Sequence, residues 1–326
     1  MKVLITGASG LVGSNLIRHL LDSGITVRAL LDPGLDTPTL DGLPFERVPG
    51  DVLDPESILG GLAGAHAVFH CALVTELRPP RSRAARARNV DGTRNLLVGM
   101  SRSGVENLVH VGSASSFGPG TMDEPGTEET PFDPRAFRFT CFDSIRQAQE
   151  LVLRYNQSGK VRCVIVNPTL VMGEYGLPCG PGTDIMEYSS IGRYTSGGAN
   201  VVGAADVARG ILKALGRGKA GRCYILGGSN VEYRDLYGMI ATSMGFPPPM
   251  RLSGDRAVIA RGLLGSLYGR ITGRVPARNA PAARLAVAPI YYTQRRAALE
   301  LELPMSPLDA VVEGACRWMT DNRDSR

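Results

Sequence analysis

The chain has 326 residues, of which 43% are hydrophobic, and a formal net charge of +5. This length and composition allow a sizeable buried core, in one large domain or in two unequal ones. The 40 glycines and 22 prolines follow no repeat, which excludes a collagen-like or low-complexity protein. No apolar run approaches the ~20 residues that cross a bilayer, and no apolar leader precedes the first predicted strand. We therefore expect a globular, cytoplasmic protein without a membrane partner.

Much of the positive excess comes from one local run of arginines. Its members are Arg78, Arg81, Arg83, Arg86 and Arg88. Nucleic-acid binding usually needs a broad basic face with interleaved aromatic side chains, so we expect no nucleic-acid partner. We interpret the run as a solvated helix face, with an anionic-substrate or interface role as the alternative. The six cysteines lack the close pairs typical of zinc or redox sites, so we expect reduced thiols and no metal.

Short apolar runs of β-type alternate with helical patterns through the first half of the chain. These runs are Val3–Thr6, Thr26–Leu30, Ala67–His70, Leu108–Gly112 and Val161–Val166. Buried parallel strands have continuous apolar sequences and need a crossover between them. The alternation predicts an α/β fold, a Rossmann-type doubly wound parallel sheet, over residues 1–170.

Beyond Pro168 the pattern loosens into Gly- and Pro-rich stretches such as Gly173–Thr183. We interpret residues 171–326 as a smaller C-terminal substrate-binding lobe, with segments around 201–228 returning to the first domain. A helix near Asp309–Asp321 carries the only tryptophan, Trp318, and is expected to pack on this lobe.

A glycine-rich turn, Gly7-Ala8-Ser9-Gly10-Leu11-Val12-Gly13, follows the first predicted strand and opens an amphipathic helix. Glycines at this spacing let the chain turn tightly and bring backbone N–H groups against a pyrophosphate. The anion then lies at the positive end of the helix dipole. We therefore predict that a dinucleotide binds here; the alternative is an ordinary Gly-rich turn. The predicted contacts are Gly7, Ser9, Gly10, Leu11, Val12 and Gly13.

The spacing Thr6-Gly7-x-x-Gly10-x-x-Gly13 resembles the short-chain dehydrogenase/reductase superfamily. Four further segments are similar to its extended branch, the NAD-dependent epimerase/dehydratase type. They are Asp51–Asp54, Phe69–Ala72, Asn89–Thr93 and Asn167–Thr169. The tail Tyr291–Trp318 is similar to the ending of sugar epimerases and dihydroflavonol reductases. The resemblance implies a nicotinamide cofactor in contact with Asp51, Val52, Cys71, Ala72, Leu73, Asn89, Val111, Pro168 and Thr169.

The choice between NAD(H) and NADP(H) depends on the end of the second predicted strand, Leu30-Leu31-Asp32-Pro33. In the resembling family, NAD-preferring members carry a carboxylate at the Leu31 position, and NADP-preferring members often an arginine at the Asp32 position. This chain has neither. Asp32 could bind ribose hydroxyls and would repel a 2′-phosphate, whereas Ser9 or Arg28 could accept one. Both cofactors therefore stay open.

Members of the resembling family use a Ser-Tyr-Lys set, in which tyrosine exchanges the proton and lysine lowers its pKa. The resemblance places the serine at Ser113. The helix expected to carry Tyr-x-x-Ser-Lys reads Cys141-Phe142-Asp143-Ser144-Ile145, so Cys141 and Ile145 occupy the usual Tyr and Lys positions. A shift by one residue would pair Phe142 with Arg146 and still supply no phenol.

Three other groups are weaker candidates for the proton donor. The thiol of Cys141 has no nearby cation in the sequence to lower its pKa. No motif positions Asp143 or His110, and their ordinary interpretations are a first-turn helix carboxylate and a surface or core histidine.

The sequence therefore favours an atypical NAD(P)H-dependent ketoreductase, resembling the members of this branch that lack the Tyr-Lys pair. Its expected substrate is a ketone of an aromatic, angucyclinone-like polyketide, whose own phenol assists protonation. Met172, Tyr175, Met186, Tyr188 and Tyr194 are candidate pocket residues. One alternative is an inactive NAD(P)-binding sensor or scaffold. Another, ranked last, is a nucleotide-sugar epimerase or dehydratase, because epimerisation needs a tyrosinate. A monomer or a homodimer is expected.

Overall fold

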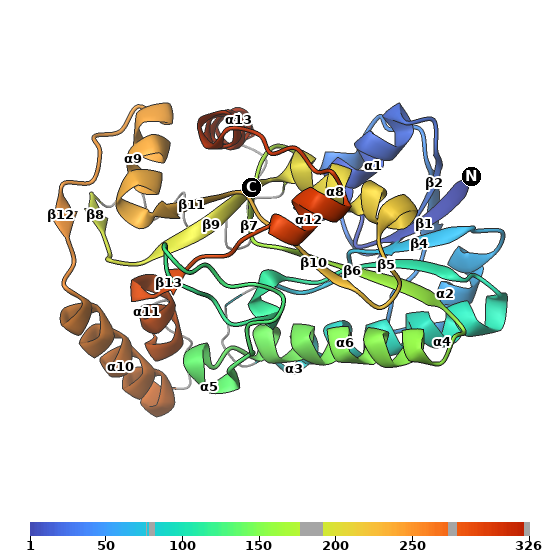
Figure 1. Cartoon of the computed structure of the whole chain (residues 1–326), viewed down its shortest axis with the longest axis horizontal. Coiled ribbons are helices and arrows are strands. Elements are labelled where there is room, and N and C mark those ends of the chain that lie inside the picture. The colour runs from blue at the N-terminus through green and yellow to red at the C-terminus, as the bar shows by residue number, and fades with distance from the viewer. Residues whose placement is uncertain (76, 78–81, 177–191, 273–278, 323–326) are drawn as a thin grey trace.

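The computed structural model describes residues 1–75, 77, 82–176, 192–272 and 279–322. Seven parallel strands form the main sheet, in the order β10-β6-β5-β4-β1-β2-β3 (Figure 1). The strands are β1 (Lys2–Thr6), β2 (Thr26–Leu31), β3 (Glu46–Pro49), β4 (Ala67–His70), β5 (Asn107–Val111), β6 (Arg162–Pro168) and β10 (Cys223–Leu226). The strand order reverses between β1 and β4, as in doubly wound Rossmann sheets. The predicted fold class is confirmed.

Successive residues of each strand enter separate cores on the two faces of this sheet. In β1, Val3 and Ile5 pack against one set of helices and Leu4 against the other. The first face is covered by α1 (Leu11–Asp22) and α8 (Ala204–Arg217). The second face is covered by α2 (Pro55–Leu62), α4 (Thr93–Ser103) and α6 (Thr140–Gln157). Burial on both faces explains why these strands read as continuous apolar runs.

Short elements connect these layers. They are the 3-10 turns Pro38–Leu40 and Ala114–Ser116, α3 (Arg83–Arg86), the π-helical segment Ala87–Gly92, and α5 (Pro134–Phe137). The π-helical segment leads directly into α4, and such segments often occur at functional sites.

The second half of the chain adds a smaller lobe with sheets of its own. In this lobe β9 (Gly198–Gly203) pairs with β7 (Leu170–Met172), β11 (Ser229–Glu232) and β13 (Pro289–Ile290), while β8 (Arg193–Tyr194) pairs with β12 (Arg251–Leu252). The helices are α9 (Tyr233–Ser243), α10 (Asp255–Thr272), α11 (Ala280–Val287), α12 (Arg295–Glu300) and α13 (Leu308–Asp321). Figure 1 shows α10 at the outer corner of this lobe, with α11 on its inner side.

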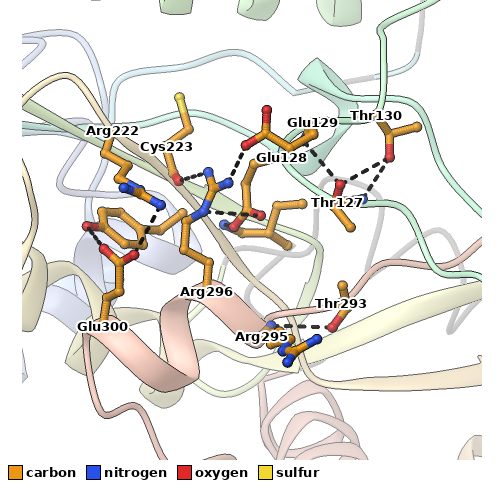
Figure 2. A network of polar contacts seen from close by, with 12 residues as sticks. Thr127, Glu128, Glu129, Thr130, Arg222, Cys223, Thr293, Arg295, Arg296 and Glu300 are labelled. Atoms are coloured by element: carbon orange, nitrogen blue, oxygen red, sulfur yellow. Dashed lines mark hydrogen bonds and ion pairs between the residues drawn. The ribbon is translucent and has the colours of Figure 1, made fainter.

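The open edge of β10 is covered by side chains from two other segments (Figure 2). The carboxylate of Glu128 accepts a hydrogen bond from Ile225 N at 2.8 Å. The guanidinium of Arg296 donates to Cys223 O at 3.1 Å and pairs with Glu128 at 3.8 Å. These contacts satisfy backbone groups that would otherwise be free to pair with another strand. Among the described residues, no helix is long and apolar enough to cross a membrane.

Candidate functional site

A cavity of about 920 Å³ is lined by residues of both lobes. Its wall begins at the glycine-rich turn after β1, continues past the ends of β2, β4, β5 and β6, and reaches α10 and α13. Ligands of doubly wound sheets bind beyond the carboxyl ends of the strands, where the strand order reverses. The cavity occupies that place in this protein.

The glycine-rich turn leaves no room for side chains at two of its positions. Gly7 has φ +69°, and a Cβ there would lie 2.5 Å from the backbone of Cys71. A Cβ at Gly13 would lie 2.2 Å from Gly7 O. The chain can therefore pass close under the start of α1, and Gly10, Leu11 and Val12 line the cavity there. This cradle of backbone N–H groups fits a pyrophosphate.

The structure brings fifteen of the sixteen predicted cofactor residues to the cavity wall. They are Gly7, Ser9, Gly10, Leu11, Val12, Gly13, Asp32, Asp51, Val52, Cys71, Ala72, Leu73, Val111, Pro168 and Thr169. Asn89 is the exception, because it is fully buried behind the wall. Its side chain holds the backbone of Val74 through bonds of 2.7 and 3.0 Å and donates to Ser144 Oγ at 2.9 Å. Asn89 therefore positions the loop after β4.

Arg88 bridges two carboxylates at one end of the cavity. Its guanidinium lies 2.9 Å from Asp51 and 3.4 Å from Asp32, and all three residues line the wall. The interpretation of the arginine run as a solvated face is therefore wrong for Arg88, although Arg83 and Arg86 are exposed. Arg78 and Arg81 lie outside the described residues.

Arg28, the sequence-based candidate for a 2′-phosphate contact, does not reach the cavity. Its guanidinium donates to Gly61 O at 3.0 Å and Ala63 O at 2.6 Å, and it pairs with Glu46 at 2.7 Å. In β2 the side chain of Arg28 points toward the end of α2. The prediction that Arg28 could accept a 2′-phosphate was therefore wrong. Ser9, the other candidate, does line the wall.

Ser113 follows β5 and lines the cavity as the N-cap of the turn Ala114–Ser116. Its Oγ accepts hydrogen bonds from Ser115 N at 3.2 Å and from Ser115 Oγ at 3.0 Å. Both of these bonds use oxygen lone pairs, so the hydroxyl proton of Ser113 is available for a ligand.

The helix α6 presents Phe142 and Ile145 to the cavity. Cys141 is buried and does not line the wall, and Arg146 instead donates to Ser116 O at 3.2 Å and pairs with Glu150. Four tyrosines but no lysine occur on the described part of the wall. The tyrosines are Tyr194, Tyr233, Tyr237 and Tyr292.

The other sequence-based proton donors lie away from the cavity. Asp143 does not line the wall, and partial burial raises the pKa of its carboxyl. His110 is fully buried in the sheet, with its ring 5.2 Å from that of His70. Cys71 does line the wall, but burial raises the pKa of its thiol to about 12, so it is a neutral thiol near pH 7.

The outer wall of the cavity, which is the part formed by the C-terminal lobe, is rich in aromatic side chains that lie far apart in the sequence. Tyr233 and Tyr237 stack at 5.5 Å, and Trp318 Nε1 donates to Gly176 O at 2.9 Å. Of the predicted pocket residues, Met172 and Tyr194 line the wall, Tyr175 packs against Trp318 at 4.7 Å, and Met186 and Tyr188 lie outside the described residues. The sequence analysis missed Tyr233 and Tyr237 of α9 and Tyr292, which follows β13, because their positions give no local signal.

Comparison with known proteins places this geometry in a family. Residues 3–227 match the model of the NAD dependent epimerase/dehydratase family. The chain is similar to the putative dihydroflavonol 4-reductase of Synechocystis sp., with 29% identity over 98% of this chain and 94% of that protein. It is also similar to the 4-hydroxy-2-methyl-3-oxo-4-farnesyl-3,4-dihydroquinoline-1-oxide ketoreductase of Stigmatella aurantiaca, with 30% identity over 88% of this chain and 86% of that protein.

Among solved structures, the fold matches that of the Thermus thermophilus UDP-glucose 4-epimerase complex with NAD. The TM-score is 0.79 at 18% identity, over 98% of this chain and 99% of that one, which shows a common fold. The chain belongs to the NAD-dependent epimerase/dehydratase family, and its cofactor is a nicotinamide dinucleotide.

Proposed function

We propose that the protein is an NAD(P)H-dependent ketoreductase that acts on an apolar, fused-ring aromatic ketone of the angucyclinone-like kind. The cofactor gives a hydride to the carbonyl carbon, and the carbonyl oxygen takes a proton from the phenol of the substrate or from water. The main support is the part of the cavity wall that contains Ser113. The hydroxyl of Ser113 can donate a hydrogen bond to a ligand, and Phe142 and Ile145 of α6 line the same cavity. No lysine lines the described part of the wall.

The wall supports hydride transfer without a Tyr-Lys pair. Holding two reactants in alignment can supply roughly 7–11 kcal/mol of barrier reduction, whereas a general acid typically contributes ~10²–10⁴-fold. Ser113 can donate a hydrogen bond to the carbonyl oxygen as negative charge develops there. A phenol next to the ketone can do the same through an internal O–H···O bond, so the substrate replaces the missing acid.

The residues that line the cavity support an apolar substrate. Tyr233, Tyr237 and Trp318 line it. The similar ketoreductase from Stigmatella aurantiaca is named for a farnesylated dihydroquinoline, which supports reduction of a ketone on a fused ring.

Asp32 and Asp51 support a preference for NAD(H). Their two carboxylates share the single guanidinium of Arg88. A 2′-phosphate would add negative charge to a place where the carboxylates already outnumber the cation, whereas a ribose diol can donate hydrogen bonds to Asp32.

The proposal is tested by following oxidation of NADH and NADPH with polycyclic ketones that carry a neighbouring phenol. The matched controls are the methyl ethers of the same ketones, which keep the shape and lose the proton. We expect turnover of the phenols and a loss of about 10²-fold or more for the ethers. Equal rates for both would contradict substrate-assisted protonation.

The same panel includes nucleotide sugars, because two arginines of the wall, Arg193 and Arg261, could bind a diphosphate. Interconversion or dehydration of a nucleotide sugar, without ketone reduction, would favour an epimerase or dehydratase. Tight cofactor binding without turnover of any compound would favour a sensor or scaffold.

A further inference from the structure

An apolar stripe on α10 faces away from the protein. It consists of Leu263, Leu264, Leu267, Tyr268 and Ile271, each between 50% and 77% exposed. Residues of a helix advance by about 100° each, so these five positions share one side of α10. Folded proteins rarely leave such a continuous row of large apolar side chains in water unless a partner covers it.

The opposite side of α10 is attached to the lobe. Gly262 is buried against α11, where a Cβ would lie 2.4 Å from Ala283 Cβ. Val258, Arg261 and Gly262 line the cavity. The helix is therefore held in place by its inner side, and none of the five stripe residues lines the cavity.

Arginines flank the stripe, and no carboxylate lies on it. At about 100° per residue, Arg270 falls at one edge and Arg256 lies near the N-terminal end, while Arg261, at the other edge, lines the cavity. Asp255 is the only acidic residue of α10, and its carboxylate accepts a hydrogen bond from Ser196 Oγ at 2.6 Å. A second copy of the stripe would bring more arginines to these edges without acids to neutralise them.

We propose that α10 lies in the surface of an anionic lipid bilayer, with its apolar stripe among the acyl chains and with Arg256 and Arg270 at the headgroups. Helices with an apolar side and basic edges bind membranes in this way, and long arginine side chains reach outward to the phosphates. The sequence-based expectation of no membrane partner rested on the lack of a membrane-crossing segment, which a helix in the surface plane does not need. Docking of α10 is independent of the ketoreductase proposal.

The test is co-sedimentation of the full chain with vesicles of phosphatidylcholine alone and of phosphatidylcholine mixed with phosphatidylglycerol. We expect binding to the mixed vesicles that weakens as salt is added. The double variant Leu264→Glu with Ile271→Glu should bind them about tenfold more weakly or worse, because two apolar side chains that would enter the bilayer are replaced by anions. Leu299→Glu, at a 70% exposed position on α12, is the matched control and should bind as the wild type does.

Arg256→Gln with Arg270→Gln should reduce binding to the mixed vesicles and leave the weak binding to phosphatidylcholine unchanged. Failure of the wild type to bind mixed vesicles, or equal binding by the Leu264→Glu and Ile271→Glu double variant, overturns the proposal. Light scattering that shows a dimer in the wild type and a monomer in this double variant, with no vesicle binding, assigns the stripe to a second copy instead.

Discussion

Ser113 reaches the cavity with a hydroxyl whose proton is not engaged, whereas Cys141 is buried in α6 and does not reach the wall. The family resemblance places both residues in one catalytic set, but of the two only Ser113 lines the cavity where a ligand would bind. Their separate substitution distinguishes an active-site donor from a packing residue.

We expect Ser113→Ala to lower kcat/KM for the ketone about 10²-fold, because one donor to the developing oxyanion is lost. Cys141→Ala should stay within about threefold of the wild type, because its thiol is not on the wall. Initial rates measure both effects, and a cofactor titration checks that both variants still bind NADH. A 10²-fold loss in Cys141→Ala would make the thiol the acid.

Asp32 is expected to set the cofactor preference. The wild type should use NADH better than NADPH, and Asp32→Asn should raise the relative kcat/KM for NADPH about tenfold by removing one carboxylate from the Arg88 cluster. Asp36→Asn, at an exposed position outside the cavity wall, is the control and should change nothing. A wild type that prefers NADPH would refute the assignment.

At the scale of elements, β4 and β5 pair two buried histidines inside the sheet. His70 lies opposite His110, and its ring nitrogens bond Thr6 Oγ1 at 2.7 Å and Thr93 Oγ1 at 3.0 Å. Within the described structure neither ring nitrogen of His110 has a hydrogen-bond partner. Burial lowers the pKa of His70 to about 4 and holds that of His110 well below its usual value.

Stability should therefore fall as the pH drops below about 6.5, the usual histidine pKa. Between there and about 4, the unfolded chain binds protons that the folded chain excludes, at a cost of up to about 1.4 kcal/mol per pH unit for each histidine. Urea unfolding at several pH values measures this slope. His110→Leu should reduce it, while His66→Gln, at an exposed position, should not. An unchanged slope in His110→Leu would contradict the argument.

At the same scale, we expect the side chains that cover the edge of β10 to stabilise the fold. Arg296→Ala leaves the Glu128 carboxylate, whose side chain is only 4% exposed, without its cation and frees Cys223 O. We expect a loss of about 2–4 kcal/mol in the free energy of unfolding, as for a broken buried pair. Arg295→Ala, the exposed neighbour in Figure 2, should cost less than about 0.5 kcal/mol. Equal effects of the two variants would show that the network contributes little.

At the scale of the whole molecule, one core joins parts of the chain on both sides of residue 170. Leu16 and Ile17 of α1 share it with Ile211 of α8 and Tyr224 of β10. Leu301, just after α12, belongs to the same core. We therefore propose that the two predicted domains are functional lobes and not independent folding units. The first lobe needs later segments of the chain to complete its sheet and to cover one face of that sheet.

A fragment of residues 1–170 should consequently fail to fold, because it lacks an edge strand and exposes the core that α8 covers. The full chain should unfold in one cooperative step, measured by circular dichroism in urea. A cooperative transition of the isolated fragment would show that the division at residue 170 separates independent folding units.

The sequence alone determined the fold class and identified the glycine-rich turn that lines one part of the cavity. These features depend on local spacing: apolar runs between helical crossovers, and glycines at positions 7, 10 and 13 between a strand and a helix. They follow from steric and hydrogen-bonding rules that act within a few residues.

Only the tertiary structure decided which side chains meet. It directed Arg28 away from the cavity, brought Arg88 to Asp32 and Asp51, and put Asn89 behind the wall. It also gathered the tyrosines of the outer wall and left the stripe of α10 exposed. These arrangements join residues tens to hundreds of positions apart, and the packing of whole layers, which local spacing does not encode, sets the distances between them.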